Sequence, residues 1–155
     1  MKTIIISGSV GSGKTTLAKK LAKKYDLEYV DVSKTIKEKN LYEIYEKKHD
    51  SFIVDTKKLN KFLIGIIKKS KKNLIIDSHL SHYLPPRYVD LCIITRCDLK
   101  TLEKRLKKRG YKKNKIRENL DCEIFEVCLN EAQKRKHKIE LIDTTNKVNI
   151  SKIKI

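Results

Sequence analysis

The sequence contains no apolar run approaching about 20 residues, the length that a membrane-spanning helix needs. Its N-terminal apolar run is followed at once by glycines and is too short for the hydrophobic region of a signal peptide. Internal repeats, low-complexity segments and a recognisable linker are also missing. These absences exclude a membrane protein and predict a single cytoplasmic domain over residues 1–155.

Paired cysteines are missing as well. None of the four cysteines is spaced as C-x-x-C, so the sequence gives little support to a zinc knuckle or ribbon. We expect reduced and mostly buried thiols at Cys92, Cys97, Cys122 and Cys128.

Acidic residues are scarce, with 19 Asp and Glu against 37 Lys and Arg, for a net charge of +18. Lysine supplies 31 of these bases and arginine only 6, and such a lysine bias can extend over a whole genome. The position of the charge is more informative: residues 98–117 carry +8, whereas residues 25–55 carry −3. The basic segment favours an acidic polyphosphate partner, and a solvated lysine surface is the alternative.

Short apolar runs alternate with amphipathic segments along the chain. The pattern predicts strands at 2–7, 27–32, 73–77, 88–95 and 138–143. It predicts helices at 14–25, 33–50, 55–70 and 98–110, and a long one from about 116 to 135. Strands that alternate with helices predict an α/β fold of three layers around a five-stranded parallel sheet.

Residues 8–15, GSVGSGKT, match the pattern G-x-x-x-x-G-K-[ST] between a predicted strand and a predicted helix. Three of the five glycines lie here, which indicates that the backbone must approach a ligand closely. Successive N–H groups of such a loop form a nest for phosphate at the positive end of the following helix. We expect Lys14 to reach the β- and γ-phosphates, Thr15 to ligate Mg²⁺ and Thr16 to contact the α-phosphate.

Asp77 ends an apolar strand, at the edge where parallel sheets bind ligands. Beside a phosphate loop, this carboxylate is predicted to orient Mg²⁺ and its waters, although a turn residue is the alternative. His79 follows two residues later and is expected near the γ-phosphate.

Because arginine is rare in this chain, Arg96, Arg105 and Arg109 are candidates for bidentate phosphate recognition. Arg105 and Arg109 are four residues apart and so share one helical face. Phosphoryl transfer needs such cations to offset the charge on the equatorial oxygens.

Four segments together resemble one known family: GSVGSGKTT (8–16), NLYEIYEKKHDSFIVD (40–55), IIDSHLSHYLPPRY (75–88) and RLKKRGYKKNKIRENLDCEIFEV (105–127). They are similar to adenylate kinase isoenzyme six and its archaeal homologues, from residue 2 to about 147. The family is made of small P-loop kinases and ATPases tied to late assembly of the small ribosomal subunit.

The resemblance implies a P-loop NTPase core of the nucleoside monophosphate (NMP) kinase type, with an NMP-binding segment at about 31–54 and a short lid at about 108–118. It implies that Asp77 and His79 are a modified Walker B pair that positions Mg²⁺ and water. The implied catalytic residues are Lys14, Asp77, His79, Arg105 and Arg109, and the implied ATP contacts are Gly11, Gly13, Lys14, Thr15, Thr16, Arg109 and Lys147.

Two departures from the family pattern affect these expectations. Lys37 stands where the family usually has an arginine that grips the monophosphate, so the bidentate fork is lost and NMP affinity is in question. The tail after Lys147 is shorter than usual, which predicts a truncated final helix.

The implied activity is ATP + AMP ⇌ 2 ADP with broad NMP specificity, together with ATP hydrolysis and a role in maturation of the small ribosomal subunit. The alternative is an ATPase assembly factor that binds ribosomal protein uS11 and the small-subunit precursor, with a possible rRNA contact and secondary kinase activity. A P-loop kinase for another small metabolite is a third hypothesis.

Overall fold

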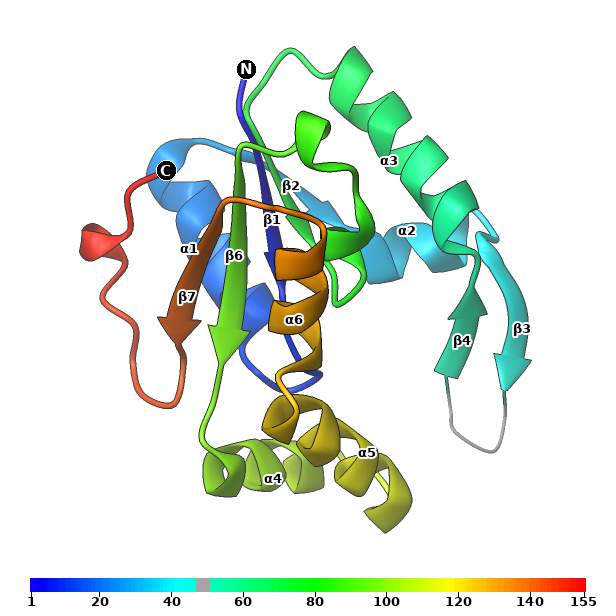
Figure 1. Cartoon of the computed structure of the whole chain (residues 1–155), viewed down its shortest axis with the longest axis vertical. Helices are drawn as coiled ribbons and strands as arrows, with labels where there is room; N and C mark the ends of the chain where they lie inside the picture. The colour runs from blue at the N-terminus through cyan, green and yellow to red at the C-terminus, as the bar shows by residue number, and fades with distance from the viewer. Residues whose placement is uncertain (47–50) are drawn as a thin grey trace.

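The computed structural model describes residues 1–46 and 51–155. Its central sheet has five parallel strands in the order β2-β5-β1-β6-β7 (Figure 1). The strands are β1 (Thr3–Ser7), β2 (Glu28–Asp31), β5 (Leu74–Asp77), β6 (Leu91–Arg96) and β7 (Ile139–Asp143). The predicted fold class is therefore confirmed, and all five strands lie within about three residues of their predicted positions.

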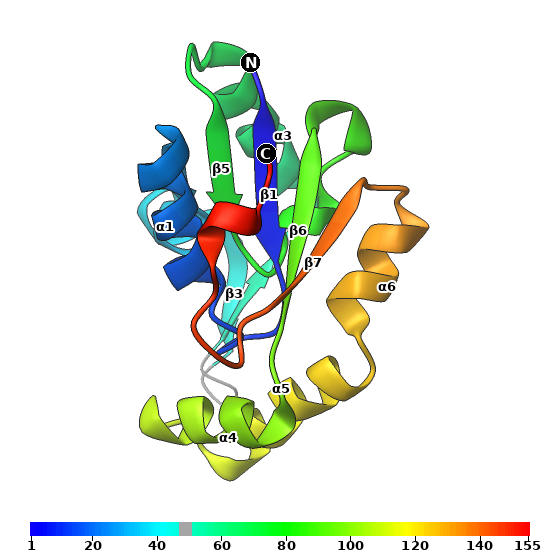
Figure 2. The same cartoon turned by 90° about the vertical axis from the view of Figure 1, so that its left-hand side faces the viewer.

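All five residues of β1 are buried, because the strand lies at the centre of the sheet and both faces are covered. Helix α1 (Lys14–Tyr25) packs on one face together with Ile153, near the end of the chain. Helices α3 (Thr56–Lys69) and α6 (Val127–Lys134) pack on the other. Figure 2 shows α1 and α6 on opposite sides of the sheet, which makes the three layers visible.

Helices α4 (Leu99–Lys108) and α5 (Lys113–Ile124) lie against each other beyond the carboxyl end of β6 (Figures 1 and 2). They enclose a small separate core of Cys97, Leu102, Leu106 and Ile116. Asp98 begins α4 by accepting a hydrogen bond from the Thr101 N–H, as an N-cap should. The basic segment of the sequence is thus placed directly beyond the edge of the sheet that carries the phosphate loop.

The prediction of one helix over residues 33–50 is wrong. Helix α2 (Val32–Glu38) is followed by a β-hairpin of two antiparallel strands, β3 (Tyr42–Glu46) and β4 (Ser51–Val54). Asn40 adopts a left-handed φ of 49°, which ends helical geometry. The apolar residues after it fit a two-residue repeat as well as a helical one, and residues 47–50 lie outside the described part of the chain.

The prediction of one long helix up to residue 135 is also wrong. Helix α5 ends at Ile124, and α6 begins at Val127 after Glu126 adopts a left-handed φ of 48°. The Glu126 carboxylate forms an ion pair with Arg96 at the end of β6, which holds the break against the sheet. Elsewhere, the chain over Pro86–Tyr88 forms a 3-10 turn, so β6 starts three residues later than predicted, and the tail has only a 3-10 turn at Ile150–Lys152.

All four cysteines are free thiols, and three of them are buried, as predicted. Among the described residues, no helix is both long and apolar enough to cross a membrane.

Candidate active site

The phosphate loop connects the end of β1 to the start of α1. Gly8 and Gly13 take positive φ values of 143° and 84°, which glycine adopts at little cost. A Cβ atom on Gly8 would lie 2.4 Å from the Thr95 hydroxyl oxygen, so any side chain there would clash with β6. Glycine is therefore needed for the loop to lie against the neighbouring strand.

Hydrogen bonds from three different elements hold this loop. The Ser12 hydroxyl lies 2.6 Å from the Thr95 hydroxyl of β6, and Thr144, after β7, donates to the Ser12 carbonyl at 2.5 Å. From α5, the Glu123 carboxylate accepts from the Ser9 hydroxyl at 2.5 Å and from the Cys97 N–H at 2.9 Å. Each bond contributes on the order of 1 kcal/mol, and together they preorganise the loop.

Lys14 is half-buried, and its ammonium lies within the loop. The Nζ atom donates to the carbonyl oxygens of Gly8 and Ser9 at 2.9 and 2.8 Å. Burial lowers the pKa of Lys14, and the nearby Asp77 carboxylate partly opposes that shift. These two hydrogen bonds hold the Lys14 ammonium against the start of the loop.

Asp77 is 5% exposed at the carboxyl end of β5. Its Oδ2 atom accepts hydrogen bonds from the Thr15 hydroxyl at 2.6 Å and from the Tyr29 hydroxyl at 2.9 Å. Burial and the bond to Asp77 raise the pKa of Tyr29, so the phenol stays protonated. Hydroxyl and carboxylate oxygens are the ligand types that Mg²⁺ prefers, and the Thr15–Asp77 pair fits that ion.

His79 follows Asp77 in the segment that leads to the 3-10 turn η1 (Ser81–Tyr83). Desolvation by the surrounding protein, reinforced by repulsion from Lys14, lowers the pKa of His79 to about 4. The imidazole is therefore neutral at physiological pH, and its lowered pKa makes it better suited to orient a water molecule by accepting a hydrogen bond than to remove a proton.

A cleft of about 680 Å³ lies on the other side of the loop, between α1, α4 and the segment after β7. This volume is within the range of roughly 300–1,000 Å³ that small-molecule sites occupy. Predicted site residues that line it are Gly11, Gly13, Thr16, Arg105, Arg109 and Lys147. Thr144, Thr145, Asn146 and Val148 complete the wall formed by the segment after β7.

The structure changes the interpretation of two arginines. One terminal nitrogen of Arg105 donates to the carbonyl oxygens of Thr144 and Thr145 at 2.7 and 3.3 Å, and the other contacts the Cys97 sulfur. Its guanidinium thus fastens the cleft wall to α4. Arg96 forms its ion pair with Glu126. Arg109, by contrast, is exposed at the mouth of the cleft.

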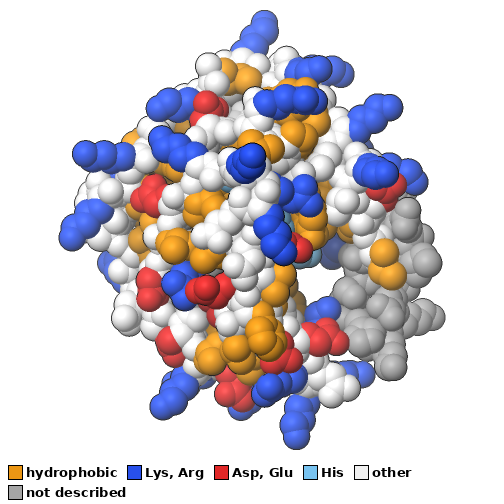
Figure 3. All heavy atoms as spheres, in the orientation of Figure 1, with side chains coloured by type: hydrophobic (Ala, Val, Ile, Leu, Met, Phe, Trp, Pro, Cys, Tyr) orange, Lys and Arg blue, Asp and Glu red, His pale blue; other side chains and the backbone are white. Residues whose placement is uncertain are grey.

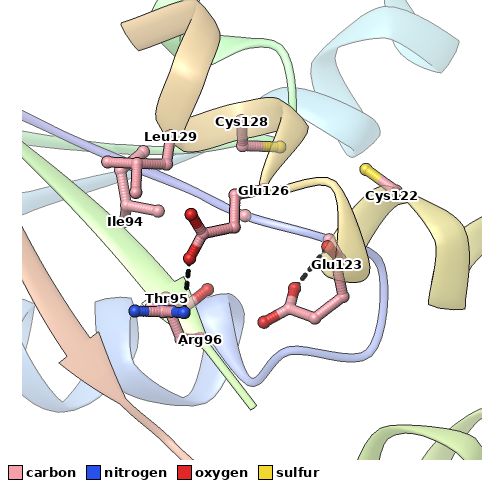
Figure 4. Close-up of a pocket in the computed structure, with 10 residues that line it drawn as sticks. Ile94, Thr95, Arg96, Cys122, Glu123, Glu126, Cys128 and Leu129 are labelled. Carbon is pink, nitrogen blue, oxygen red and sulfur yellow. Dashed lines mark hydrogen bonds and ion pairs between the residues drawn. The ribbon is translucent and has the colours of Figure 1, made fainter. Parts of the chain in front are cut away.

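A much smaller cavity of about 10 Å³ lies behind the loop, between the end of β6 and the junction of α5 and α6. Figure 4 shows Cys122 and Cys128 on its far side, with the Glu126–Arg96 ion pair in front. A hydrogen bond from Cys128 lowers the pKa of Cys122. The cavity has room for about one water molecule, so it supports the loop but cannot hold a nucleotide.

Sequence reasoning missed Tyr29, Glu123 and Thr144. Tyr29 reaches Asp77 because β2 pairs with β5, with Val30 opposite Ile76 and Asp31 opposite Asp77. Glu123 and Thr144 contact the loop from 114 and 132 residues away along the chain. No local motif marks Tyr29 or Thr144, and Glu123 lies within the family-like segment 105–127 without a pattern that assigns it a contact. The strand order brings Tyr29 to Asp77, and the tertiary structure brings Glu123 and Thr144 to the loop.

Comparison with known proteins agrees with this geometry. The family model described as "AAA domain" matches residues 4–126. A Methanocaldococcus jannaschii protein named "Putative adenylate kinase" is 40% identical over 93% of this chain and 77% of its own length. The "Adenylate kinase isoenzyme 6 homolog" of Dictyostelium discoideum is 37% identical over 92% of this chain and 82% of its own. This chain belongs to the adenylate kinase isoenzyme 6 family.

Membership in the adenylate kinase isoenzyme 6 family confirms the resemblance and the enzyme class, a phosphotransferase. Among solved structures, the shikimate kinase of Bacteroides thetaiotaomicron has a TM-score of 0.58 with 16% identity. That alignment covers 93% of this chain and 87% of the other. At this identity the likeness bears on the fold alone, and it agrees with the P-loop kinase architecture.

Proposed function

We propose that this chain is a broad-specificity adenylate kinase that catalyses ATP + AMP ⇌ 2 ADP and also hydrolyses ATP. The observation that carries the proposal is that five of the predicted ATP-contacting residues, Gly11, Gly13, Thr16, Arg109 and Lys147, line one cleft at the phosphate loop. Those residues come from the phosphate loop, the first turn of α1, the C-cap of α4 and the segment after β7, so one bound nucleotide can contact all of these elements.

In this proposal the loop N–H groups and Lys14 bind the β- and γ-phosphates. Thr15 and Asp77 hold Mg²⁺, which neutralises charge on the phosphate oxygens when it is bound. Arg109 offsets the charge that develops on the transferred group, and Arg105 positions the cleft wall that carries Lys147. The acceptor oxygen of AMP is already anionic, so transfer to AMP needs no strong general base.

The acceptor would bind at residues 31–54, where α2 carries Lys37 and the hairpin of β3 and β4 follows. Residues 108–118 would form the lid, because they connect the end of α4 to the first turns of α5 beside the cleft. Both segments belong to the single domain that the sequence predicts. Closure of the lid would exclude water from the transferred phosphoryl group.

Water as the acceptor makes a different demand, because its proton must be removed or oriented. The neutral imidazole of His79 and the carboxylate of Asp77 are the two groups available for this step. We therefore expect Asp77→Asn and His79→Ala to remove ATP hydrolysis while His79→Ala retains transfer to AMP. Parallel loss of both activities in His79→Ala would show that the same group serves both reactions.

An assembly role in small-subunit maturation is the second candidate function, with ribosomal protein uS11 and pre-rRNA as partners. An exposed apolar surface at the break between α5 and α6 supports a protein partner, since Phe125 is 68% and Ile124 47% exposed. Leu99 and Leu141 extend this surface across a hollow that also contains Glu123 and Glu126. Lysine and arginine side chains spread over much of the face in Figure 3, which suits a contact with rRNA.

One experiment separates the two functions: steady-state ADP formation with ATP alone, with each NMP, and with small ribosomal subunits. We expect AMP to accelerate ADP formation most. If AMP has no effect while ribosomal particles stimulate turnover, the chain acts as an ATPase assembly factor. If no NMP and no particle accelerates turnover, the acceptor is another small metabolite.

A further inference from the structure

A buried histidine lies next to the proposed active site without belonging to it. His82, in η1, is 1% exposed, and both of its ring nitrogens are hydrogen-bonded. Nδ1 lies 2.8 Å from the hydroxyl of Ser7, the last residue of β1 before the phosphate loop. Nε2 lies 2.7 Å from the Glu131 carboxylate of α6. The imidazole therefore connects α6 to the root of the phosphate loop.

The partners determine where the protons lie in this chain of hydrogen bonds. The Glu131 carboxylate can only accept, and its other oxygen already accepts from the Tyr83 hydroxyl at 2.9 Å. Nε2 must therefore carry the proton, which leaves the Nδ1 lone pair to accept the Ser7 hydroxyl proton. Burial lowers the pKa of His82 although the Glu131 bond opposes the shift, so the imidazole is neutral at physiological pH.

The Ser7 hydroxyl also lies 3.3 Å from the backbone carbonyl oxygen of His79. A hydroxyl has one proton, so Ser7 cannot donate fully to both His82 and this carbonyl. When His82 is neutral, Ser7 donates to Nδ1. When His82 is protonated, Nδ1 becomes a donor and the Ser7 proton turns to His79. The protonation state of His82 therefore changes the hydrogen bond to the backbone carbonyl of His79, a proposed catalytic residue.

The arrangement Ser7–His82–Glu131 has the residue types of a nucleophilic triad, but its burial excludes that role. Ser7 is fully buried and the backbone beside it is paired, since its carbonyl accepts from the Thr95 hydroxyl at 3.2 Å. No substrate can approach the Ser7 oxygen. The hydrogen bonds can instead hold β1, η1 and α6 at fixed positions relative to one another.

Other contacts fasten the same segment on both sides of His82. The Ser81 hydroxyl donates to the Ile6 carbonyl of β1 at 2.9 Å, and the His82 carbonyl lies 2.9 Å from Nε2 of His137. The charged and titratable groups that face the imidazole are Glu131 of α6, Arg135 at the C-cap of that helix, His137 beyond it, His79, and Tyr83, which packs beside the ring at 4.6 Å between centroids. The chain of hydrogen bonds from Ser7 through His82 to Glu131 is therefore surrounded by further contacts, and His82 is its ionisable link to β1.

We propose that His82 is a positioning residue for phosphoryl transfer: through Ser7 and Glu131 it sets the phosphate loop and the segment of His79 relative to α6. The proposal rests on the proposed kinase function. Misplacement of reacting groups by a fraction of an ångström slows the chemical step more than it weakens ground-state binding. We therefore expect substitutions of these residues to lower kcat more than they raise KM.

The test compares Ser7→Ala, His82→Phe and Glu131→Gln with the control Tyr83→Phe. The control removes a hydrogen bond to the same carboxylate but leaves the path to the phosphate loop intact. We expect kcat for ATP plus AMP to fall about tenfold in Ser7→Ala and His82→Phe, with KM for both nucleotides changed less than twofold. Tyr83→Phe should keep the wild-type kcat, and His82→Gln should recover part of the loss in His82→Phe.

The acidic limb of the kcat–pH profile provides a second measurement, since removing His82 should change its shape while Tyr83→Phe leaves it unchanged. A wild-type kcat in Ser7→Ala, or equal losses in Tyr83→Phe and His82→Phe, would overturn the proposal. Thermal unfolding identifies variants that fail to fold. If His82→Phe is one of them, Ser7→Ala and Glu131→Gln decide the question.

A spectroscopic measurement separates this proposal from the proposed function. Nitrogen-15 NMR of the histidine rings should show His82 protonated at Nε2 alone at neutral pH, and Ser7→Ala should shift both the Nδ1 signal and the His79 backbone signals. If the wild type fails to phosphorylate any NMP, the proposed function is wrong. The NMR signals still test whether Ser7 links His82 to the His79 backbone. An unchanged His79 backbone in Ser7→Ala would then overturn the proposed role of His82.

Discussion

The phosphate side and the acceptor side of the proposed site are built differently. The phosphate loop is buried at Gly8, Ser9 and Ser12 and is held by hydroxyl and carboxylate groups from β6, α5 and the segment after β7. On the acceptor side, α2 buries only Val32 and Ile36, and its remaining residues face solvent to different degrees. Phosphate binding is thus preorganised in the core, whereas acceptor binding depends on a peripheral helix and hairpin.

This difference has a physical reason. A phosphate loop must present several N–H groups at once, and the entropy of ordering them is best offset during folding. An acceptor segment must admit one nucleotide and release another, so it gains from weaker attachment to the core. Three predictions test whether function follows this division.

The largest effect is expected at the centre of the phosphate side. Lys14→Ala should lower kcat/KM for ATP-dependent phosphorylation of AMP by about 10²- to 10³-fold, because it removes the cation enclosed by the loop. The measurement is ADP formation at varied ATP concentration. Lys23→Ala, an exposed lysine in the last turn of the same helix, is the matched control and should retain wild-type turnover. A similar loss in both variants would mean that overall charge, and not the loop, controls activity.

A smaller effect, of opposite sign, is expected on the acceptor side. Lys37→Arg should lower KM for AMP roughly fivefold, because a guanidinium can grip a phosphate with two parallel hydrogen bonds. KM for ATP should stay constant, since Lys37 lies on α2 and not on the cleft. Lys34→Arg on the same helix is the control. If KM for AMP does not respond to Lys37→Arg, residues 31–54 do not bind the acceptor phosphate.

The smallest effect concerns stability in acid. His82 and His137 are buried, and burial lowers the pKa of both side chains. The unfolded chain then binds more protons than the folded one below the ordinary histidine pKa of about 6.5. The stabilisation is complete above about pH 6.5 and declines as the pH falls toward the lowered pKa values of the two histidines.

Urea unfolding at pH 7 and pH 5 measures this decline. Replacing His137 by Asn should make the free energy of unfolding depend less on pH, because one histidine with a lowered pKa is removed. Amides of η1 should lose protection from hydrogen exchange before those of α2 as the pH falls, since the buried His82 lies in η1 and His137 contacts its carbonyl oxygen. Equal loss of protection in both regions would contradict the division between the two sides.

Local patterns predicted much of this protein. The motif GSVGSGKT located the phosphate loop, and Asp77 was placed correctly at the end of a buried strand because the apolar run before it is short, rich in isoleucine and bounded by polar residues. Residues 33–50 and 116–135 were misread because a left-handed residue, Asn40 or Glu126, interrupts a pattern that continues across it. A backbone dihedral at a non-glycine residue leaves little trace in the sequence.

By itself the sequence determined the fold class, the phosphate loop and the family. Only the tertiary structure decided which distant side chains support that loop: Tyr29 beside Asp77, Glu123 and Thr144 against the loop, and the chain from Ser7 through His82 to Glu131. The reason is that glycine and apolar spacing act over a few residues, whereas these contacts join residues 48 or more apart. Such pairs meet because the order of parallel strands places their carboxyl ends at one edge of the sheet.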